Sequence, residues 1–262
     1  YYSLCKDIEG IRLLYGSLIK PAAAFLYDYI DRDTGLPEGS YDIWEEQYGT
    51  SAFTAGAVWA GLEAASKFVL AFGERSLAKK YSIAAQKIKD AVLKYMYDPE
   101  KGRFIRMIKI GDNGCKEPDY RLDSSICGVY LFGMFEPSHP YVVNTMKEIE
   151  RSLWCQTPYG GIARYYDDSY LRTTNNLQEV PGNPWFISTL WLAEWYIARA
   201  SSLNDLERPL ALLKWIQSLA MPGGTLPEQF NPYTGEPLSA APLVWSHAEL
   251  ALAIQAYAAK VM

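Results

Sequence analysis

The sequence predicts an all-α protein in which inner and outer helices alternate in a double ring. Helical periodicity runs through most of the 262 residues. Residues 51–72 are rich in Ala and aromatic side chains with few charges, as in an enclosed helix. Residues 74–97 instead place apolar side chains on one face and charges on the rest, as in an outer helix. Because no shared pattern recurs every 20 to 50 residues, a simple stacked helical repeat is disfavoured.

The individual helices follow from this periodicity and from their start signals. Thr50 or Ser51 is expected to cap the second helix and Asp123 the fourth. Pro184 and Pro242 are expected to open the sixth helix and the last one at their first turn. Alternation replaces the helical period only near residues 102–110, which predicts a short pair of strands. The expected helices span residues 4–30, 51–72, 74–97, 123–134, 139–154, 184–202, 205–220 and 242–261.

Composition and charge exclude several classes of partner. With 49% hydrophobic and 21% charged residues, the chain can bury a large core in one or two domains. A net charge of -5 with dispersed Lys and Arg argues against nucleic acid as a partner. The most apolar segment, residues 184–200, carries Glu194 and Arg199 and is too polar to span a bilayer. We therefore expect neither a nucleic-acid nor a membrane partner.

The cysteines and histidines do not form a recognisable metal motif. There is no CxxC spacing, so a zinc site is poorly supported, and we expect a metal-independent mechanism without a cofactor. GxSxG and phosphate-loop motifs are also absent from the sequence. The cysteine spacing favours the cytoplasm over secretion, although the compartment stays open because the chain begins with Tyr1. The residues concerned are Cys5, Cys115, Cys127, Cys155, His139 and His247.

Acidic residues stand out in two of the loops. In "SYDIWEEQYG", Glu45 and Glu46 directly follow Trp44. Adjacent carboxylates repel, and an indole removes the water that screens them, so one of them should keep its proton more readily. Glu228 lies just before the last helix, and it would face this pair if both loops open at one end of the ring. Hydrolysis of a glycosidic bond needs such a protonated acid and an ionised carboxylate, but a single loop glutamate is usually a solvated surface group.

Four sequence blocks cover most of residues 36–262: "SYDIWEEQYGTSAFTAGAVWAGL", "RYYDDSY", "GNPWFISTLWLAEWY" and "PEQFNPYTGEPLSAAPLVWSHAEL". They resemble, in the same order, the signature segments of glycoside hydrolase family 15, the glucoamylases, which also contains the glucodextranases. The resemblance implies an (α/α)6 barrel, of whose twelve helices this chain supplies about eight. Residues 1–262 are then expected to form the C-terminal portion of a glucoamylase-like catalytic domain that lacks the N-terminal helices.

The same resemblance implies roles for individual residues. Glu45 matches the general acid and Glu228 the general base that activates water, with their carboxyls roughly 6.5 to 9.5 Å apart in an inverting enzyme. Glu46 matches an acid that contacts the sugar next to the cleaved bond. The walls and hydroxyl contacts of the sugar pocket are implied for Trp44, Trp185, Arg164, Asp168 and Tyr170. Tyr41 and Trp245 are expected only as packing around the site.

The resemblance implies an exo-acting inverting α-glucosidase that releases β-glucose from the non-reducing ends of starch-like glucans or maltooligosaccharides. Glucodextran and trehalose are alternative substrates. A catalytically degenerate protein that binds glucan or regulates a partner is the rival, but such a protein would not need the distant base Glu228.

Two departures from the family pattern bear on this expectation. Residues 171–181 intervene before "GNPW" and should lie at the cleft rim, where they would affect substrate choice. Arg32 and Asp33 lie too close to Glu45 to be the family's sugar-holding Arg-Asp pair. An open arc of helices would also expose apolar faces, which predicts a homo-oligomer or a missing N-terminal segment.

Overall fold

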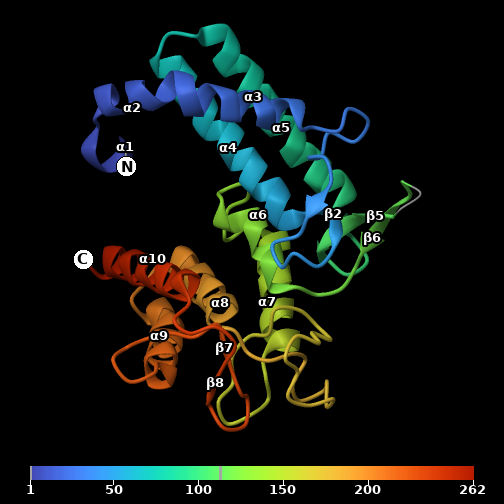
Figure 1. Cartoon of the computed structure of the whole chain (residues 1–262), viewed down its shortest axis with the longest axis vertical. Coiled ribbons are helices and arrows are strands. Elements are labelled where there is room, and N and C mark those ends of the chain that lie inside the picture. Colours follow the sequence, from blue (N-terminus) through green and yellow to red (C-terminus); the bar gives the residue numbers. More distant parts are fainter. Residues whose placement is uncertain (1, 112–113) are drawn as a thin grey trace.

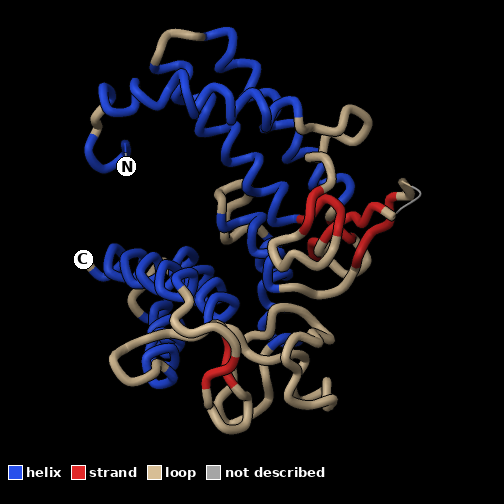
Figure 2. Tube along the Cα trace, in the orientation of Figure 1, coloured by secondary structure: helices blue, strands red, loops and turns tan. Residues whose placement is uncertain are grey.

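Helices in two layers form an arc that is open on one side in the computed structural model, which describes residues 2–111 and 114–262 (Figures 1 and 2). The inner layer, which faces the opening, consists of α4 (Ala52–Ala71), α6 (Gly128–Leu131), α8 (Phe186–Arg199) and α10 (Val244–Val261). The outer layer consists of α3 (Lys20–Asp28), α5 (Arg75–Tyr95), α7 (Pro140–Leu153) and α9 (Glu207–Leu219). The expected all-α class and the alternation of inner and outer helices are confirmed.

The amphipathic pattern of α5 explains its position in the outer layer. Its apolar side chains Tyr81, Ala84, Ile88 and Val92 are buried against α4, while its charged side chains point outward. The enclosed helix α4 has a much weaker separation of polar and apolar faces, and its Ala55, Leu62 and Val69 are buried. The difference between the two helices in the sequence therefore corresponds to their difference in layer.

The expected first helix is divided into several elements. Helix α1 (Tyr2–Cys5) ends before Lys6, whose backbone has a positive φ of 54°. Helix α2 (Ile8–Leu14) then starts anew, because the Asp7 carboxylate accepts a hydrogen bond from the Gly10 N–H at 2.8 Å. A π-helical turn (Tyr15–Ile19) joins α2 to α3.

The expected caps of the other helices are partly confirmed. Ser51 caps α4 by accepting a hydrogen bond from the Thr54 N–H, and Asp123 caps the 3-10 helix η2 (Ser124–Cys127) that leads into α6. The expectation for Pro184 and Pro242 is wrong, since α8 and α10 begin two residues later. The intervening residues are extended because the Trp185 N–H bonds to Ile162 and the Leu243 N–H bonds to Leu226.

Short antiparallel strands lie at the ends of the helices. Strands β1 (Ser40–Tyr41), β2 (Tyr48–Ser51), β5 (Met107–Ile110) and β6 (Lys116–Asp119) form a four-stranded sheet in the order β1-β2-β5-β6. Residues 103–110 are extended as expected, but β4 (Arg103–Phe104) pairs with β3 (Tyr97–Asp98) and not with β5. A third pair joins β7 (Gln229–Phe230) to β8 (Pro237–Leu238). The β1-β2 hairpin matters most, because its tip carries residues 42–47.

The main core lies between the inner and outer helices and includes the fully buried Trp191 and Trp195 of α8. A smaller apolar cluster under the β7-β8 loop contains Phe186 and Phe230. Within the described residues, no helix combines the length and apolar character needed to cross a bilayer.

Candidate active site

The expected site residues come from loops that are joined to one another at one end of the inner helices. Helices α4, η2 and α8 begin at this end, directly after Ser51, Asp123 and Trp185. The strand β7, which follows Glu228, pairs with the segment before α8. The connections are isolated backbone bridges between Asp123 and Tyr165, Ala163 and Pro184, and Trp185 and Gln229. Segments more than a hundred residues apart in the sequence thus meet around one site.

A pre-set turn at the tip of the β1-β2 hairpin presents Glu45. The Glu45 N–H donates to the Asp42 carbonyl at 3.0 Å, and the Asp42 carboxylate accepts from the Glu46 and Gln47 N–H groups at 2.9 and 3.3 Å. Glu45 itself has a φ of 59°, in the left-handed region that L-residues rarely adopt. Its side chain is exposed, while Asp42 below it is buried.

The neighbouring Glu46 is engaged by a buried arginine. Although the sequence around Glu46 contains no basic residue, the Arg164 Nη2 atom lies 2.8 Å from its Oε1. Arg164 also binds both carboxylate oxygens of Asp168 at 2.8 Å, and the Tyr165 hydroxyl donates to Glu46. Burial alone would lower the pKa of Arg164, but the hydrogen bonds and charge of Asp168, together with the charge of Glu46, raise it. Arg164 compensates the charge of Glu46, so the repulsion between Glu45 and Glu46 that the sequence suggests is reduced.

Arg164 is also at the centre of an aromatic enclosure. Its guanidinium carbon lies 5.2 Å from the ring of Trp44, 4.8 Å from that of Trp185 and 5.1 Å from that of Tyr170. The Trp44 and Trp185 rings meet edge to face, with centroids 5.8 Å apart. The structure thus brings together Trp44, Glu46, Arg164, Asp168, Tyr170 and Trp185, all of which the sequence nominated.

A buried ionic network holds the Trp44 loop from below. The Trp44 indole N–H donates to the Asp123 carboxylate, at 3.0 Å from Oδ2. Arg106 lies between two carboxylates, with its Nη2 2.5 Å from Asp42 and its Nε 3.0 Å from Asp123. Burial raises the pKa of Asp123, against the opposing effects of Arg106, Ser125 and Trp44. Arg106 therefore links the turn that presents Glu45 to the cap of η2.

Glu228 and Trp185 present polar atoms that have no partner among the described residues. The Glu228 Oε2 and the Trp185 Nε1 are both buried and accept or donate no hydrogen bond there. The backbone of Glu228 is fixed, because its N–H donates to Ala240 at 2.9 Å and its carbonyl accepts from Phe186 at 3.4 Å. A buried carboxylate oxygen and a buried indole N–H are costly without partners, so each favours a polar group that enters the site.

The segment 171–181 lies beside the site, as expected. The Asn183 Nδ2 atom donates to the Leu171 carbonyl and to the Gln229 Oε1, both at 2.8 Å, and the Thr173 hydroxyl donates to the Asn183 Oδ1. Asn183 therefore connects this segment to the residue that follows Glu228.

The two peripheral aromatics behave differently. Trp245 packs on Trp44 with centroids 6.2 Å apart, as expected of a packing residue. Tyr41 is 65% exposed and contacts Tyr48 across the hairpin, so it does not belong to the core. Arg32 is exposed and lines an outer groove with Tyr27 and Lys87.

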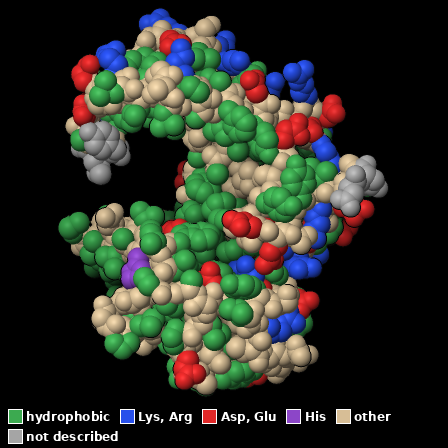
Figure 3. Space-filling model, in the orientation of Figure 1, with side chains coloured by type: hydrophobic (Ala, Val, Ile, Leu, Met, Phe, Trp, Pro, Cys, Tyr) green, Lys and Arg blue, Asp and Glu red, His purple; other side chains and the backbone are tan. Residues whose placement is uncertain are grey.

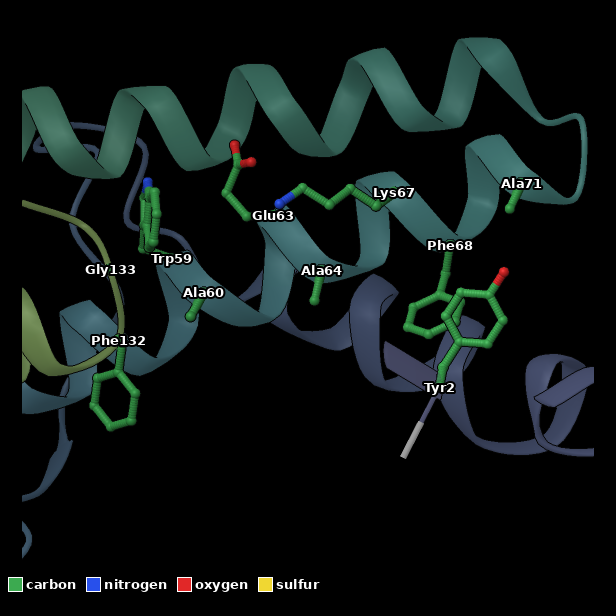
Figure 4. Close-up of a pocket in the computed structure, with 10 residues that line it drawn as sticks. All are labelled: Tyr2, Trp59, Ala60, Glu63, Ala64, Lys67, Phe68, Ala71, Phe132 and Gly133. Carbon is green, nitrogen blue, oxygen red and sulfur yellow. The ribbon is translucent and has the colours of Figure 1, made fainter. Parts of the chain in front are cut away.

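A hollow of about 660 Å³ lies elsewhere, on the side of α4 that faces the opening of the arc (Figure 4). It is lined by Trp59, Ala60, Ala64, Phe68 and Phe132, with Glu63 and Lys67 at its edge, and includes none of the site residues above. Apolar side chains are prominent around the opening in the space-filling view (Figure 3). Within residues 2–111 and 114–262, no group of three or more His, Cys, Asp or Glu is arranged to hold a metal ion.

Several residues of the site were not nominated from the sequence: Asp42, Arg106, Asp123, Tyr165, Asn183 and Gln229. Asp42 and Gln229 lie inside the signature blocks, next to nominated residues, and could have been found there. Arg106 is 64 residues from Asp42 and lies in a segment without a motif, so only the fold shows its role.

Comparison with known proteins first defines the class. A crystal structure of a bacterial glucoamylase in complex with acarbose superposes with a TM-score of 0.76 and 25% identity over 93% of this chain and 38% of the other. The fold is thus that of the (α/α)6 glucoamylases, of which this chain forms an arc.

The sequence then defines the family. The profile of glycosyl hydrolases family 15 matches residues 15–255, and the chain belongs to this family. An uncharacterized glycosyl hydrolase of Methanocaldococcus jannaschii is 31% identical over 79% of this chain and 32% of its own length. A glucoamylase of a Clostridium strain is 29% identical over 90% of this chain and 35% of its own, and a trehalase of Sulfolobus acidocaldarius is 24% identical over 82% and 34%. The chain therefore spans about a third of the length of these relatives.

Proposed function

We propose that this glycoside hydrolase is an exo-acting inverting α-glucosidase that releases β-glucose from the non-reducing ends of starch-like glucans or maltooligosaccharides. Residues 1–262 would form the C-terminal portion of its catalytic domain. The observation that carries the proposal is the junction of two acidic loops: Glu45 directly follows Trp44, Trp44 contacts Trp185, and Trp185 pairs with Gln229, next to Glu228. Each acid is therefore the sequence neighbour of a residue of this junction, Glu45 of Trp44 and Glu228 of Gln229.

The chemistry assigns different tasks to the two acids. Glu45 lies exposed at a turn whose backbone is already fixed, so it can reach a glycosidic oxygen and donate a proton to it as the bond breaks. Glu228 has a buried oxygen without a partner, so it can accept a proton from a water that attacks the anomeric carbon. The water attacks from the face opposite the leaving group, which inverts the anomeric configuration.

The remaining residues would bind the sugar. Arg164 is held rigid by Asp168 and Glu46, which bind its Nε and Nη2 atoms, so its Nη1 atom can donate to sugar hydroxyls. Trp44, Trp185 and Tyr170 would wall the pocket, and the partnerless Trp185 N–H is available to a hydroxyl. No cofactor is needed for this hydrolysis.

A trehalase-type substrate is the second candidate, favoured by the relationship to the Sulfolobus trehalase and by the segment 171–181 at the site. Trehalose has two anomeric carbons joined through one oxygen, so the same two acids would serve. A direct comparison of initial rates on maltotetraose, isomaltose and trehalose distinguishes the substrates.

The test measures glucose release from maltotetraose and the anomeric form of the first glucose by NMR. We expect β-glucose first, and a loss of at least roughly a hundredfold in kcat for Glu45→Gln and for Glu228→Gln. Glu38→Gln, an exposed glutamate in the same connection as Glu45, is the matched control and should keep full activity. α-Glucose as the first product would refute inversion, and a Glu45→Gln variant of normal activity would remove Glu45 from its role.

A binding measurement separates the enzyme from the catalytically degenerate alternative. Quenching of tryptophan fluorescence by maltooligosaccharide should persist in both Gln variants, since neither change removes an aromatic wall. Binding without any glucose release by the unmodified protein would instead support a glucan-binding or regulatory role.

A further inference from the structure

Three tryptophans form a cluster beneath the loop that carries Glu45. Trp191 of α8 and Trp245 of α10 lie with centroids 6.0 and 6.2 Å from Trp44, and 5.8 Å from each other. Trp191 is almost completely buried. The cluster connects two inner helices to the residue that directly precedes Glu45, so any movement of these indoles would be transmitted to the loop.

One carboxylate holds two of the three rings. The Glu249 Oε1 accepts hydrogen bonds from the Trp191 Nε1 at 3.3 Å and from the Trp245 Nε1 at 3.1 Å. Trp245 and Glu249 are four residues apart on α10, so their side chains lie on one face of the helix. Because an indole offers only this one donor, a single acceptor atom fixes the orientation of both rings.

A second carboxyl group, Glu194 of α8, lies next to Glu249. Its Oε1 is buried, and no donor among the described residues reaches it. Burial, followed by the charge of Glu249 and a hydrogen bond between the two carboxyl groups, raises the pKa of Glu194 to about 8. The Glu194 carboxyl therefore keeps its proton at neutral pH.

The other polar groups around the pair do not replace this proton. Burial raises the pKa values of Cys127 in η2 and Tyr130 in α6 well above their ordinary values, so both are neutral. Lys260 of α10 lines the same cavity of about 510 Å³, but its Nζ donates to the Ala198 and Ala200 carbonyls. Asp123, on the other side of Cys127, is paired with Arg106.

We propose that Glu194 and Glu249 are positioning residues: Glu249 holds Trp191 and Trp245 against Trp44 while the neighbouring Glu194 is protonated, and loss of the Glu194 proton loosens the loop of Glu45. Two adjacent carboxylates repel each other strongly where burial reduces their solvation. Glu249 would then move away from Glu194 and give up its short contacts with the two indoles. The significance for catalysis rests on the proposed role of Glu45, whereas the coupling between the pair and the tryptophans does not.

Tryptophan fluorescence of the whole protein, measured from pH 6 to pH 9.5, tests the coupling without any substrate. An ionised carboxylate beside an indole changes its emission, so the unmodified protein should show a reversible transition with its midpoint near pH 8. Glu194→Gln keeps the shape of the side chain but cannot titrate, and should show no transition in this range. Glu207→Gln, at an exposed position at the start of α9, is the matched control and should keep it.

A second variant keeps the test decisive if Glu194→Gln fails to fold. In Glu249→Gln the amide oxygen can still accept from both indoles, but the negative charge next to Glu194 is gone, so the midpoint should fall by about one pH unit or more. Far-ultraviolet circular dichroism checks the folding of each variant. A transition that is absent from the unmodified protein, or unchanged in both variants, would overturn the proposal.

Hydrolysis then separates this proposal from the proposed function. If the protein releases glucose, the alkaline decline of kcat should move to higher pH in Glu194→Gln while KM changes little. A fluorescence transition without any hydrolysis would reject the proposed function and support the coupling between Glu194, Glu249 and the tryptophans. Hydrolysis whose alkaline decline is unchanged in Glu194→Gln would reject the positioning role of Glu194 and Glu249.

Discussion

Replacement of Arg106 by methionine should both destabilise the protein and disturb the loop that carries Glu45. The Arg106 side chain is 1% exposed and lies between Asp42 and Asp123, whose side chains are 2% and 0% exposed. Methionine fills much of the space but leaves two buried carboxylates without their cation. Removing one partner from a buried ion pair typically costs about 3–5 kcal/mol, a large fraction of the roughly 5–15 kcal/mol that holds a domain folded.

The loss of unfolding free energy in Arg106→Met should be larger at high pH than at low pH. The pKa of Asp123 is already raised by burial, and Arg106 is the main group that opposes the rise. Without Arg106 the folded-state pKa of Asp123 rises further above its unfolded value, so stability is retained in acid and lost as the pH rises through that folded-state pKa. The difference in unfolding free energy between Arg106→Met and the unmodified protein should therefore be larger at pH 8 than at pH 5.

Urea denaturation followed by circular dichroism at pH 5 and pH 8 measures both effects. Arg103→Met is the matched control, because Arg103 is buried but donates to the carbonyls of Phe104 and Tyr120 and not to a carboxylate. The loss of stability in Arg103→Met should be smaller than in Arg106→Met and nearly the same at the two pH values. The double variant Arg106→Met with Asp123→Asn should recover part of the stability. A loss below about 1 kcal/mol for Arg106→Met, or one that does not grow with pH, would refute this account of the network.

The other predictions concern the proposed sugar site and the open side of the arc. Arg164→Lys cannot reproduce the paired bonds to Asp168 and should raise KM for maltotetraose at least roughly tenfold; an unchanged KM would show that Arg164 does not bind the sugar. Asn183→Ala frees the segment 171–181 from Gln229 and should change the ratio of rates on maltotetraose and trehalose, whereas equal ratios would separate that segment from specificity. The apolar face around Phe132 and the 56% exposed Leu252 should cause self-association. Light scattering should show an oligomer that Leu252→Glu weakens, and a monomer at all concentrations would contradict this expectation.

The sequence predicts best what depends on local patterns. The apolar spacing of residues 77–95 is enough to place α5 in the outer layer, and Ser51 and Asp123 are recognisable caps because their side chains bond within the next three residues. The starts of α8 and α10 could not be predicted in this way. Pro184 and Pro242 look like first-turn residues. However, the residues after them, Trp185 and Leu243, donate backbone hydrogen bonds to Ile162 and Leu226, and these bonds keep the chain extended.

The site shows the same division. Its acids and aromatics lie in recognisable blocks, whereas the groups that hold them are distant in the chain. Arg164 neutralises Glu46 across 118 residues, and Glu249 fixes Trp191 across 58. Neither contact has a local signature, because a single sequence carries no information on which distant charges meet.

The left-handed backbone at Glu45 has a consequence for how the protein could evolve. A residue other than glycine in this conformation costs on the order of 1–3 kcal/mol, so glycine at position 45 would relieve strain while abolishing the proposed acid. Selection for stability alone would therefore favour glycine over glutamate at this position.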